Sequence, residues 1–392
     1  MINKVYRKLK DEMTDEIDQF SGYAGQLLSG ETDKIDPGTI GLLQSYLIEI
    51  GNKLEKEYGV DPGSPIIHML ENSCEEIYLL MDDEDKKAGL ESLLGEIKGW
   101  PEALRGSIDD SAFRCSAVAI MRDEGKYLKE WIEHHLSVGV DHFYLYDNES
   151  KDNTASILQP YIDNKIVTMI KWPGDMVQIS AYNDAISRYK YYTEYMAFID
   201  IDEFIVPVDP VKSVPQIVDE IFDEYTKKEF KGPFQPGGVG VNWMVYGTSN
   251  RKETADEPVL EAYLYRARDD YSQNCHIKTI CDPCTVSGFT TNPHAPGYKQ
   301  GYTGISEKGS YLFNSPYFYD ASYSRLRINH YYSKSEEDFL GKIKRGWPDQ
   351  PHREIEISDP VMKKRFEEAK HECNEVYDDI MLKGFGKQRK EN

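Results

Sequence analysis

Two carboxylates in the pattern Asp200-Ile-Asp202 directly follow an apolar, β-prone stretch that begins at Tyr195. On a strand, residues two apart face the same side, so the sequence predicts both carboxylates together at the carboxyl end of a strand. Such a pair repels and loses hydration, a cost that a divalent cation offsets most simply. Oxygen ligands of this kind suit Mg²⁺ or Mn²⁺. The pattern predicts a metal site, with a solvated turn as the alternative.

Alternating strands and helices must position this pair. Apolar runs predict strands at 115–120, 143–146 and 166–170, and helical periodicity lies between them at 126–138, 155–162 and 181–192. This alternation is typical of right-handed crossover units and a parallel α/β sheet. Ligands bind such sheets beyond the carboxyl ends of the strands. Polar clusters fall at those ends, at 122–125, 147–153 and 200–202.

The chain divides into three predicted parts. Helical stripes broken at Asp36-Pro37-Gly38 and Asp61-Pro62-Gly63 predict a helical accessory domain over 1–110. A catalytic α/β domain is predicted over 111–346, with antiparallel strands and loops after Pro207. Helices at 335–345 and 360–383 close the chain, the second in a helical extension over 347–392.

Composition excludes several classes of partner. The chain has 392 residues and a formal net charge of -22, which argues against nucleic acid and anionic lipid surfaces. We find neither the apolar run of a signal peptide nor a membrane-spanning stretch of roughly 18 apolar residues, so we predict no transmembrane segment and a cytoplasmic location.

Six cysteines in a chain of this length do not form a disulfide framework. Cys275, His276, Cys281 and Cys284 lie close enough in sequence to allow a zinc site. Only one Cys-x-x-Cys pair is present, however, so we interpret these as ordinary reduced thiols and keep zinc as the alternative.

Several ordered motifs are similar to glycosyltransferase family 92, the DUF23 type related to family 2. They lie at 119–135, 139–148, 199–204, 329–335 and 344–346. The resemblance implies a GT-A fold, a Rossmann-like mixed sheet flanked by helices. It also implies an inverting, metal-dependent transfer from a nucleotide-sugar donor, in first place a UDP-sugar, to a saccharide or glycoconjugate acceptor in polysaccharide biosynthesis. Asp123 and Glu149 stand where relatives usually carry Asn, so the nucleotide pocket is expected to differ.

The resemblance also assigns roles to residues. Asp202 is the first choice for binding the metal, with Asp200 reaching the metal or the ribose, and His330 stands where many GT-A enzymes complete the metal site. For His330 the alternative is a structural role, as a core histidine whose nitrogens are hydrogen-bonded within the protein. The residues expected to bind the donor are Arg122, Glu124, Asp147, Asn183, Asp184, Asp200, Lys334 and Arg345.

An inverting transfer also needs a base that takes the proton of the acceptor hydroxyl. Glu261, Asp269 and Asp270 are the candidates, because GT-A enzymes commonly place the base in this region, and the sequence does not choose among them. His294 is a further candidate. Trp243 and Tyr246 could stack on a sugar ring or pack in the core.

Three other functional classes compete with this interpretation. Phosphatases of the haloacid dehalogenase type also use Asp-x-Asp after a strand, but they need a small Thr or Val where this chain has Phe204. A nucleotidyltransferase shares the fold and the metal. A non-catalytic sugar- or nucleotide-binding scaffold is the third alternative.

Overall fold

A computed structural model gives the structure of the protein and describes residues 22, 37–58, 74, 113–190, 192–227, 232–345 and 359–385. The chain divides into two compact units, Met1–Ala112 and Phe113–Asn392. In the first unit, helix α2 (Pro37–Tyr58) buries Leu43, Leu47 and Ile50 at helical spacing. Most of the predicted helical domain over 1–110 lies outside the described residues.

The second unit is built on a mixed sheet that has nine strands within its described residues. Four of them, β1 to β4, pair in parallel in the order β3-β2-β1-β4 and are joined by helices. The other half contains antiparallel pairs, and the order continues as β8-β6-β12-β5, with β11 beside β6. The strands are β1 (Phe113–Met121), β2 (His142–Asp147), β3 (Val167–Lys171), β4 (Thr193–Phe198), β5 (Glu203–Pro207), β6 (Gln235–Val245), β8 (Ile277–Cys281), β11 (Tyr302–Ser306) and β12 (Leu326–His330).

Strand β1 shows why helices cover both faces of the sheet. Its side chains alternate between two cores, because successive residues of a strand point to opposite faces. Cys115, Ala117 and Ala119 pack with α5 (Gly125–Ser137) and α8 (Val214–Lys227). Val118 and Ile120 pack with α7 (Gln178–Tyr189). Helix α6 (Thr154–Asp163) lies against α5 and β3.

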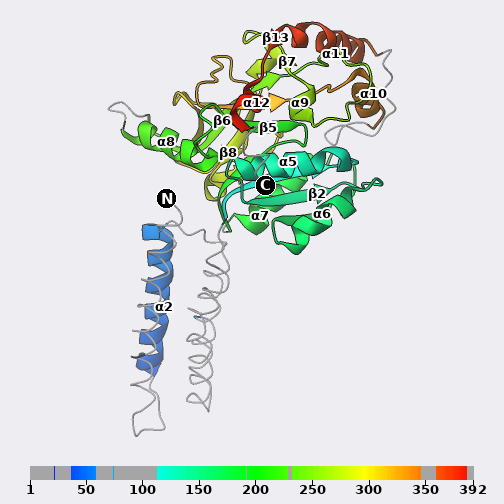
Figure 1. Cartoon of the computed structure of the whole chain (residues 1–392). Coiled ribbons are helices and arrows are strands. Elements are labelled where there is room, and N and C mark those ends of the chain that lie inside the picture. Colours follow the sequence, from blue (N-terminus) through cyan, green and yellow to red (C-terminus); the bar gives the residue numbers. More distant parts are fainter. Residues whose placement is uncertain are drawn as a thin grey trace. The chain divides into compact units, whose positions relative to one another are not determined.

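The remaining described elements are short or lie near the C-terminus. Figure 1 shows α10 (Glu336–Arg345) and α11 (Pro360–Lys370) grouped near β7 (Tyr265–Arg266) and β13 (Val376–Tyr377), away from α6 and α7. The others are α9 (Val259–Ala262), β9 (Val286–Gly288), β10 (Gly297–Tyr298), α12 (Ile380–Phe385) and the 3₁₀ turns Ser272–Cys275, Pro283–Thr285 and Glu372–Asn374. None of the described helices is both long and apolar enough to cross a membrane.

The predicted helix over 360–383 is wrong in its second half. Helix α11 ends at Lys370, and a 3₁₀ turn, strand β13 and helix α12 follow. Asn374 explains the break: its amide nitrogen donates to the carbonyl oxygens of Ala369 and Lys370, and its side-chain oxygen accepts from the backbone nitrogen of Ser249. The polar side chain thereby satisfies the end of α11 and ties it to a distant loop.

Candidate active site

The two carboxylates lie in the turn that joins β4 to β5 rather than on the strand itself. Strand β4 ends at Phe198, and Asp200 and Asp202 follow beyond its carboxyl end. The indole nitrogen of Trp131 on α5 donates to the carbonyl oxygens of Asp200 (3.1 Å) and Glu203 (2.9 Å). These two buried hydrogen bonds fix the backbone of the turn, and with it the positions of Asp200 and Asp202.

Asp200 is held by three side chains from two elements. One carboxylate oxygen accepts from the ammonium group of Lys278 on β8 at 2.9 Å. The other accepts from Gln178 at 2.9 Å and from the hydroxyl of Tyr182 at 3.4 Å, both on α7. Burial raises the pKa of Asp200, but the charge and the hydrogen bond of Lys278, together with His294, bring the pKa below its ordinary value. Asp200 is therefore ionised, and its side chain is 35% exposed.

Asp202 is more deeply buried and meets a different pair of partners. One carboxylate oxygen accepts from the ammonium group of Lys342 on α10, and the other lies 3.6 Å from Nε2 of His330 on β12. Burial opposes ionisation, yet Lys342 and His330 together hold the pKa of Asp202 well below its usual range. Burial also lowers the pKa of His330, and the nearby Asp202 offsets this only in part. The imidazole is therefore neutral at pH 7.

Glu203 is the third carboxyl group of this turn. It is fully buried, accepts from the backbone nitrogen of Asp200 at 2.9 Å and lies 3.5 Å from Lys278. Burial raises its pKa well above the ordinary value in spite of Lys278. Asp200 and Glu203 thus share the ammonium group of Lys278, whereas Asp202 faces Lys342.

The fit of this site to a divalent cation can be tested on its donor atoms. Among the residues that the structure describes, no three His, Cys, Asp or Glu side chains are grouped so as to hold one metal ion. Asp202 and His330 nevertheless supply an oxygen and a neutral nitrogen 3.6 Å apart, which one cation can share. Asp200 is engaged by Lys278. The residues thus fit a cation that has two protein ligands and takes the rest from substrate and water.

A cavity of about 250 Å³ lies beside Asp202. This is below the roughly 300–1,000 Å³ of pockets that enclose whole ligands, so it suits a part of a substrate. The ammonium groups of Lys334 and Lys342 lie over the rings of Tyr127 and Tyr332, at 4.2 Å and 4.4 Å from the ring centres. The lining residues are Glu124, Tyr127, Tyr332, Ser333, Lys334, Glu337, Asp338, Gly341 and Lys342.

Two of the predicted donor-binding residues, Glu124 and Lys334, line this cavity. Arg122 and Asp147 lie at the carboxyl ends of β1 and β2. The Nε of Arg122 donates to the carbonyl oxygen of Asn148 at 2.8 Å, and Asp147 accepts from the backbone nitrogen of Ser150 at 3.1 Å. Both side chains therefore take part in local turn structure.

Asn183 and Asp184 lie on α7 and make structural contacts. Asn183 exchanges two hydrogen bonds with the backbone of Phe289, at 2.9 Å and 2.7 Å. Asp184 accepts from the hydroxyl of Tyr146 at 2.8 Å and from Arg188 at 2.9 Å. Arg345 is the last residue of α10, and its side chain lies outside the described residues.

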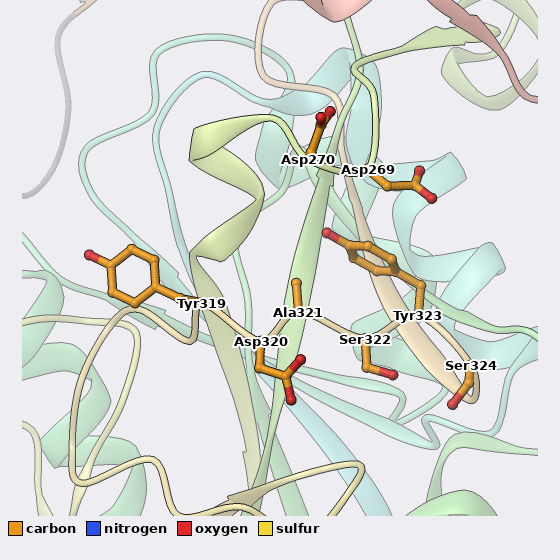
Figure 2. A pocket seen from close by; sticks show the side chains of 8 residues that line it. All are labelled: Asp269, Asp270, Tyr319, Asp320, Ala321, Ser322, Tyr323 and Ser324. Atoms are coloured by element: carbon orange, nitrogen blue, oxygen red, sulfur yellow. The ribbon is translucent and has the colours of Figure 1, made fainter.

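The predicted base residues lie on the surface. Glu261 is exposed on α9. Asp269 and Asp270 are 70% and 76% exposed and pair with Arg266 and Arg268. Figure 2 shows the second cavity that they line with residues 319–324. No described residue lines both this cavity and the one beside Asp202.

His294, Trp243 and Tyr246 have distinct surroundings. Burial, assisted by Lys278, lowers the pKa of His294 to about 3. Its Nδ1 lies 2.9 Å from the carbonyl oxygen of Ile277, which fixes the hydrogen on Nδ1, and burial leaves the ring a weak base in spite of this contact. Trp243 is half-buried beside His330, whereas Tyr246 is 1% exposed and belongs to the core.

Lys278 and Lys342 are the site residues that the sequence analysis did not identify. Lys278 is 1% exposed within the apolar strand Ile277–Cys281, and a lysine in such a run is the one local signal that marks it. Lys342 has no local signal, because lysines are common on the polar face of a helix such as α10.

The crossover half of the sheet and its antiparallel continuation form a mixed α/β sheet flanked by helices, with the carboxylate turn beyond the end of β4. The chain belongs to glycosyltransferase family 92: the profile of that family matches residues 116–360, more than half of the chain.

Known relatives match shorter segments. A family 92 protein of Ricinus communis is 34% identical over 86 residues, 22% of this chain and 16% of that protein. A beta-1,4-galactosyltransferase of Caenorhabditis elegans is 27% identical over 113 residues, 26% of this chain and 27% of that protein. TarS 1-349 of S. aureus, solved in complex with UDP, is 16% identical with a TM-score of 0.30, over 44% of this chain and 48% of that one.

Proposed function

We propose that the protein is a metal-dependent, inverting glycosyltransferase that moves a sugar from a UDP-sugar to a saccharide or glycoconjugate, as a step of polysaccharide biosynthesis. The observation that carries the proposal is the pairing of Asp202 with His330 and Lys342 beyond the carboxyl end of β4. The galactosyltransferase among the relatives makes galactose the first sugar to test.

The proposed reaction divides the work among these residues. Asp202 and His330 would hold Mn²⁺ or Mg²⁺, and the ion would supply positive charge to stabilise the departing diphosphate. Lys334 and Lys342 line the cavity that receives the diphosphate and add positive charge there. Asp200, fixed by Lys278, would reach the ribose or the metal. Arg122, Glu124 and Asp147 are proposed to border the nucleoside, because they follow β1 and β2 at the same edge of the sheet.

The acceptor base is proposed to be Glu261, Asp269 or Asp270. Replacing the base by its amide should abolish transfer without weakening nucleotide binding, since an amide cannot take the proton. Three single variants, each assayed for transfer and for UDP affinity, decide among them. If all three variants transfer sugar at the wild-type rate, none of the three residues is the base.

The activity is tested by screening nucleotide sugars with Mn²⁺, with Mg²⁺ and with EDTA. We expect nucleoside diphosphate as the product, and the configuration at the transferred carbon, read by proton NMR, should be inverted. Pyrophosphate would indicate a nucleotidyltransferase, and undiminished transfer in EDTA would refute the metal. Asp223→Asn on α8, which removes an exposed carboxylate that pairs only with Lys227 in the described structure, is the matched control for carboxylate variants.

We also propose that residues 1–110 form an accessory domain that chemistry does not need. No residue before Cys115 belongs to the matched family region. A chain that begins at Ser107 should hydrolyse donor slowly and bind UDP as the full chain does. A folded truncation that fails to bind UDP would refute this division.

A further inference from the structure

Four aromatic rings form a continuous series that starts beside the carboxylate turn and ends in solvent. Trp243 lies 4.2 Å from the ring of His330 and stacks on His276 at 4.5 Å with 15° between the planes. His276 meets the edge of Tyr317 at 4.7 Å, and Tyr317 lies 6.3 Å from Tyr319. We call these four residues, Trp243, His276, Tyr317 and Tyr319, the aromatic ledge.

The outer rings of the ledge are exposed although the backbone beneath them is fixed. Tyr317 is 42% exposed and Tyr319 is 82% exposed. Between them Phe318 points inward and packs in a small core with Ile277. The backbone nitrogen of Phe318 donates to the carbonyl oxygen of Cys275 at 2.7 Å, and that of Ile277 donates to Pro316 at 3.1 Å. The fixed backbone therefore keeps the two large rings of Tyr317 and Tyr319 exposed to solvent.

The chemistry of the ledge suits the rings of a saccharide. A pyranose carries an apolar face of C–H groups that packs on an aromatic ring, and it carries hydroxyls that need hydrogen-bond partners. Tyr319 also borders the second cavity, which Asp320, Ser322 and Ser324 line as well (Figure 2). The two serine hydroxyls donate to Glu307 and Asp320 pairs with Lys308, so the acceptor lone pairs that remain on these side chains are what a sugar hydroxyl can use. The strongly negative chain disfavours a polyanionic occupant.

We propose that the aromatic ledge binds the acceptor of the transfer reaction as an oligosaccharide of at least two sugar rings. The inference rests on the proposed function, because the inner end of the ledge lies beside His330, where the acceptor hydroxyl must meet the donor. The growing end of the acceptor lies near Trp243, and the sugars behind it lie along Tyr317 and Tyr319. Asp269 and Asp270 line the cavity that Tyr319 borders, so in this arrangement they contact the distal sugars, and Glu261 is the candidate base that stays compatible with the ledge.

The ledge predicts that the enzyme prefers longer acceptors. Mono-, di- and trisaccharides of glucose, galactose, mannose and N-acetylglucosamine are offered with UDP-galactose, and KM is measured for each. In the wild-type enzyme KM should fall by about two- to tenfold with each ring that gains a stacking partner. Tyr319→Ala should abolish the fall in KM that the outermost sugar brings. Tyr319→Phe should keep this fall, because the aromatic ring of Tyr319 rather than its hydroxyl supplies the contact.

Phe313→Ala is the matched control. Phe313 is 73% exposed in the same connection between β11 and β12, but its ring contacts Tyr311 and lies outside the ledge. The control should keep the length dependence, and melting curves should show all variants folded. Acceptor-independent release of UDP is measured in parallel, so that a failure of the proposed function is recognised separately. A KM that does not depend on acceptor length would contradict the proposal that the ledge binds the acceptor. So would a panel in which no saccharide accepts the sugar.

Discussion

At the scale of single residues, the site depends on buried charges that are matched in pairs. Asp202 and Lys342 are both largely withdrawn from water, with side chains 8% and 15% exposed. Removing one partner of a buried pair leaves the other uncompensated, at a cost of about 3–5 kcal/mol. Changes at Asp202 therefore affect stability as well as turnover, and the two effects have to be separated.

The variant Asp202→Asn should lower turnover by on the order of 10²–10³-fold, the loss seen when a main charge-stabilising group is removed. It should also lower the melting temperature, because Lys342 keeps its charge without a partner. Adding Lys342→Met should restore much of the stability without restoring turnover. Thermal melts and transfer assays of the single and double variants separate the effect on stability from the effect on turnover. Full turnover of Asp202→Asn would exclude a role of this carboxylate in the reaction.

His330 gives a second prediction at this scale. A metal ligand must be neutral, so activity should fall as the pH drops through the lowered pKa of His330, and excess Mn²⁺ should partly reverse the fall. His330→Ala should raise the Mn²⁺ concentration needed for half-maximal activity. The exposed His371, with a side chain 71% exposed, provides the control His371→Ala. An unchanged Mn²⁺ requirement together with a lowered melting temperature would identify His330 as structural.

At the scale of elements, the last part of the chain is bound to the sheet by charge. Asp378 follows β13 and pairs with Arg327 on β12 at 2.9 Å and with Arg266 on β7 at 2.7 Å. These arginines are only 8% and 13% exposed. Residues 376–378 thus belong to the same compact unit as the site, through an interaction that the sequence pattern of residues 347–392 did not reveal.

Asp378→Asn should destabilise the second unit by about 3 kcal/mol or more, because it leaves Arg327 buried and without its carboxylate. Urea unfolding followed by circular dichroism measures the loss. The neighbouring Asp379→Asn is the control: Asp379 pairs at the surface with Lys383, which is 76% exposed, and such pairs contribute about 0–1 kcal/mol. Equal effects of the two variants would show that burial of the pair is unimportant.

At the scale of the whole molecule, the sequence predicted what local patterns encode. The strands at 115–120 and 143–146 and the helix at 126–138 recur within one or a few residues as β1, β2 and α5, since apolar periodicity decides them. Lys278 and Lys342 came together with Asp200 and Asp202 only in three dimensions, because partners 78 and 140 residues apart leave no local pattern. The break of the helix at Asn374 likewise arises from contacts with a distant loop.

The histidines give the whole molecule a predictable response to acid. Burial lowers the pKa of His142 to about 4 and holds that of His135 well below its ordinary value, as it does for His294. The unfolded chain takes up protons near pH 6.5, and the folded chain does not. The stability that these groups contribute is thus fully present above pH 6.5 and is lost as the pH falls toward their folded pKa values. Asp282 has the opposite effect on stability, because burial raises its pKa to about 7. The stability that it contributes is present at low pH and is lost as the pH rises toward 7.

His142 allows this response to be measured one group at a time. Its Nδ1 lies 3.1 Å from the carbonyl oxygen of Lys165, an arrangement that an asparagine amide can reproduce without a titratable nitrogen. Between pH 6.5 and about 4, His142→Asn should reduce the slope of unfolding free energy against pH by about 1.4 kcal/mol per pH unit, the value for one proton. Urea unfolding of both proteins at several pH values in this window provides the slopes. Parallel slopes would mean that His142 takes up its proton equally in the folded and unfolded chain, and burial would then not be the cause of its lowered pKa.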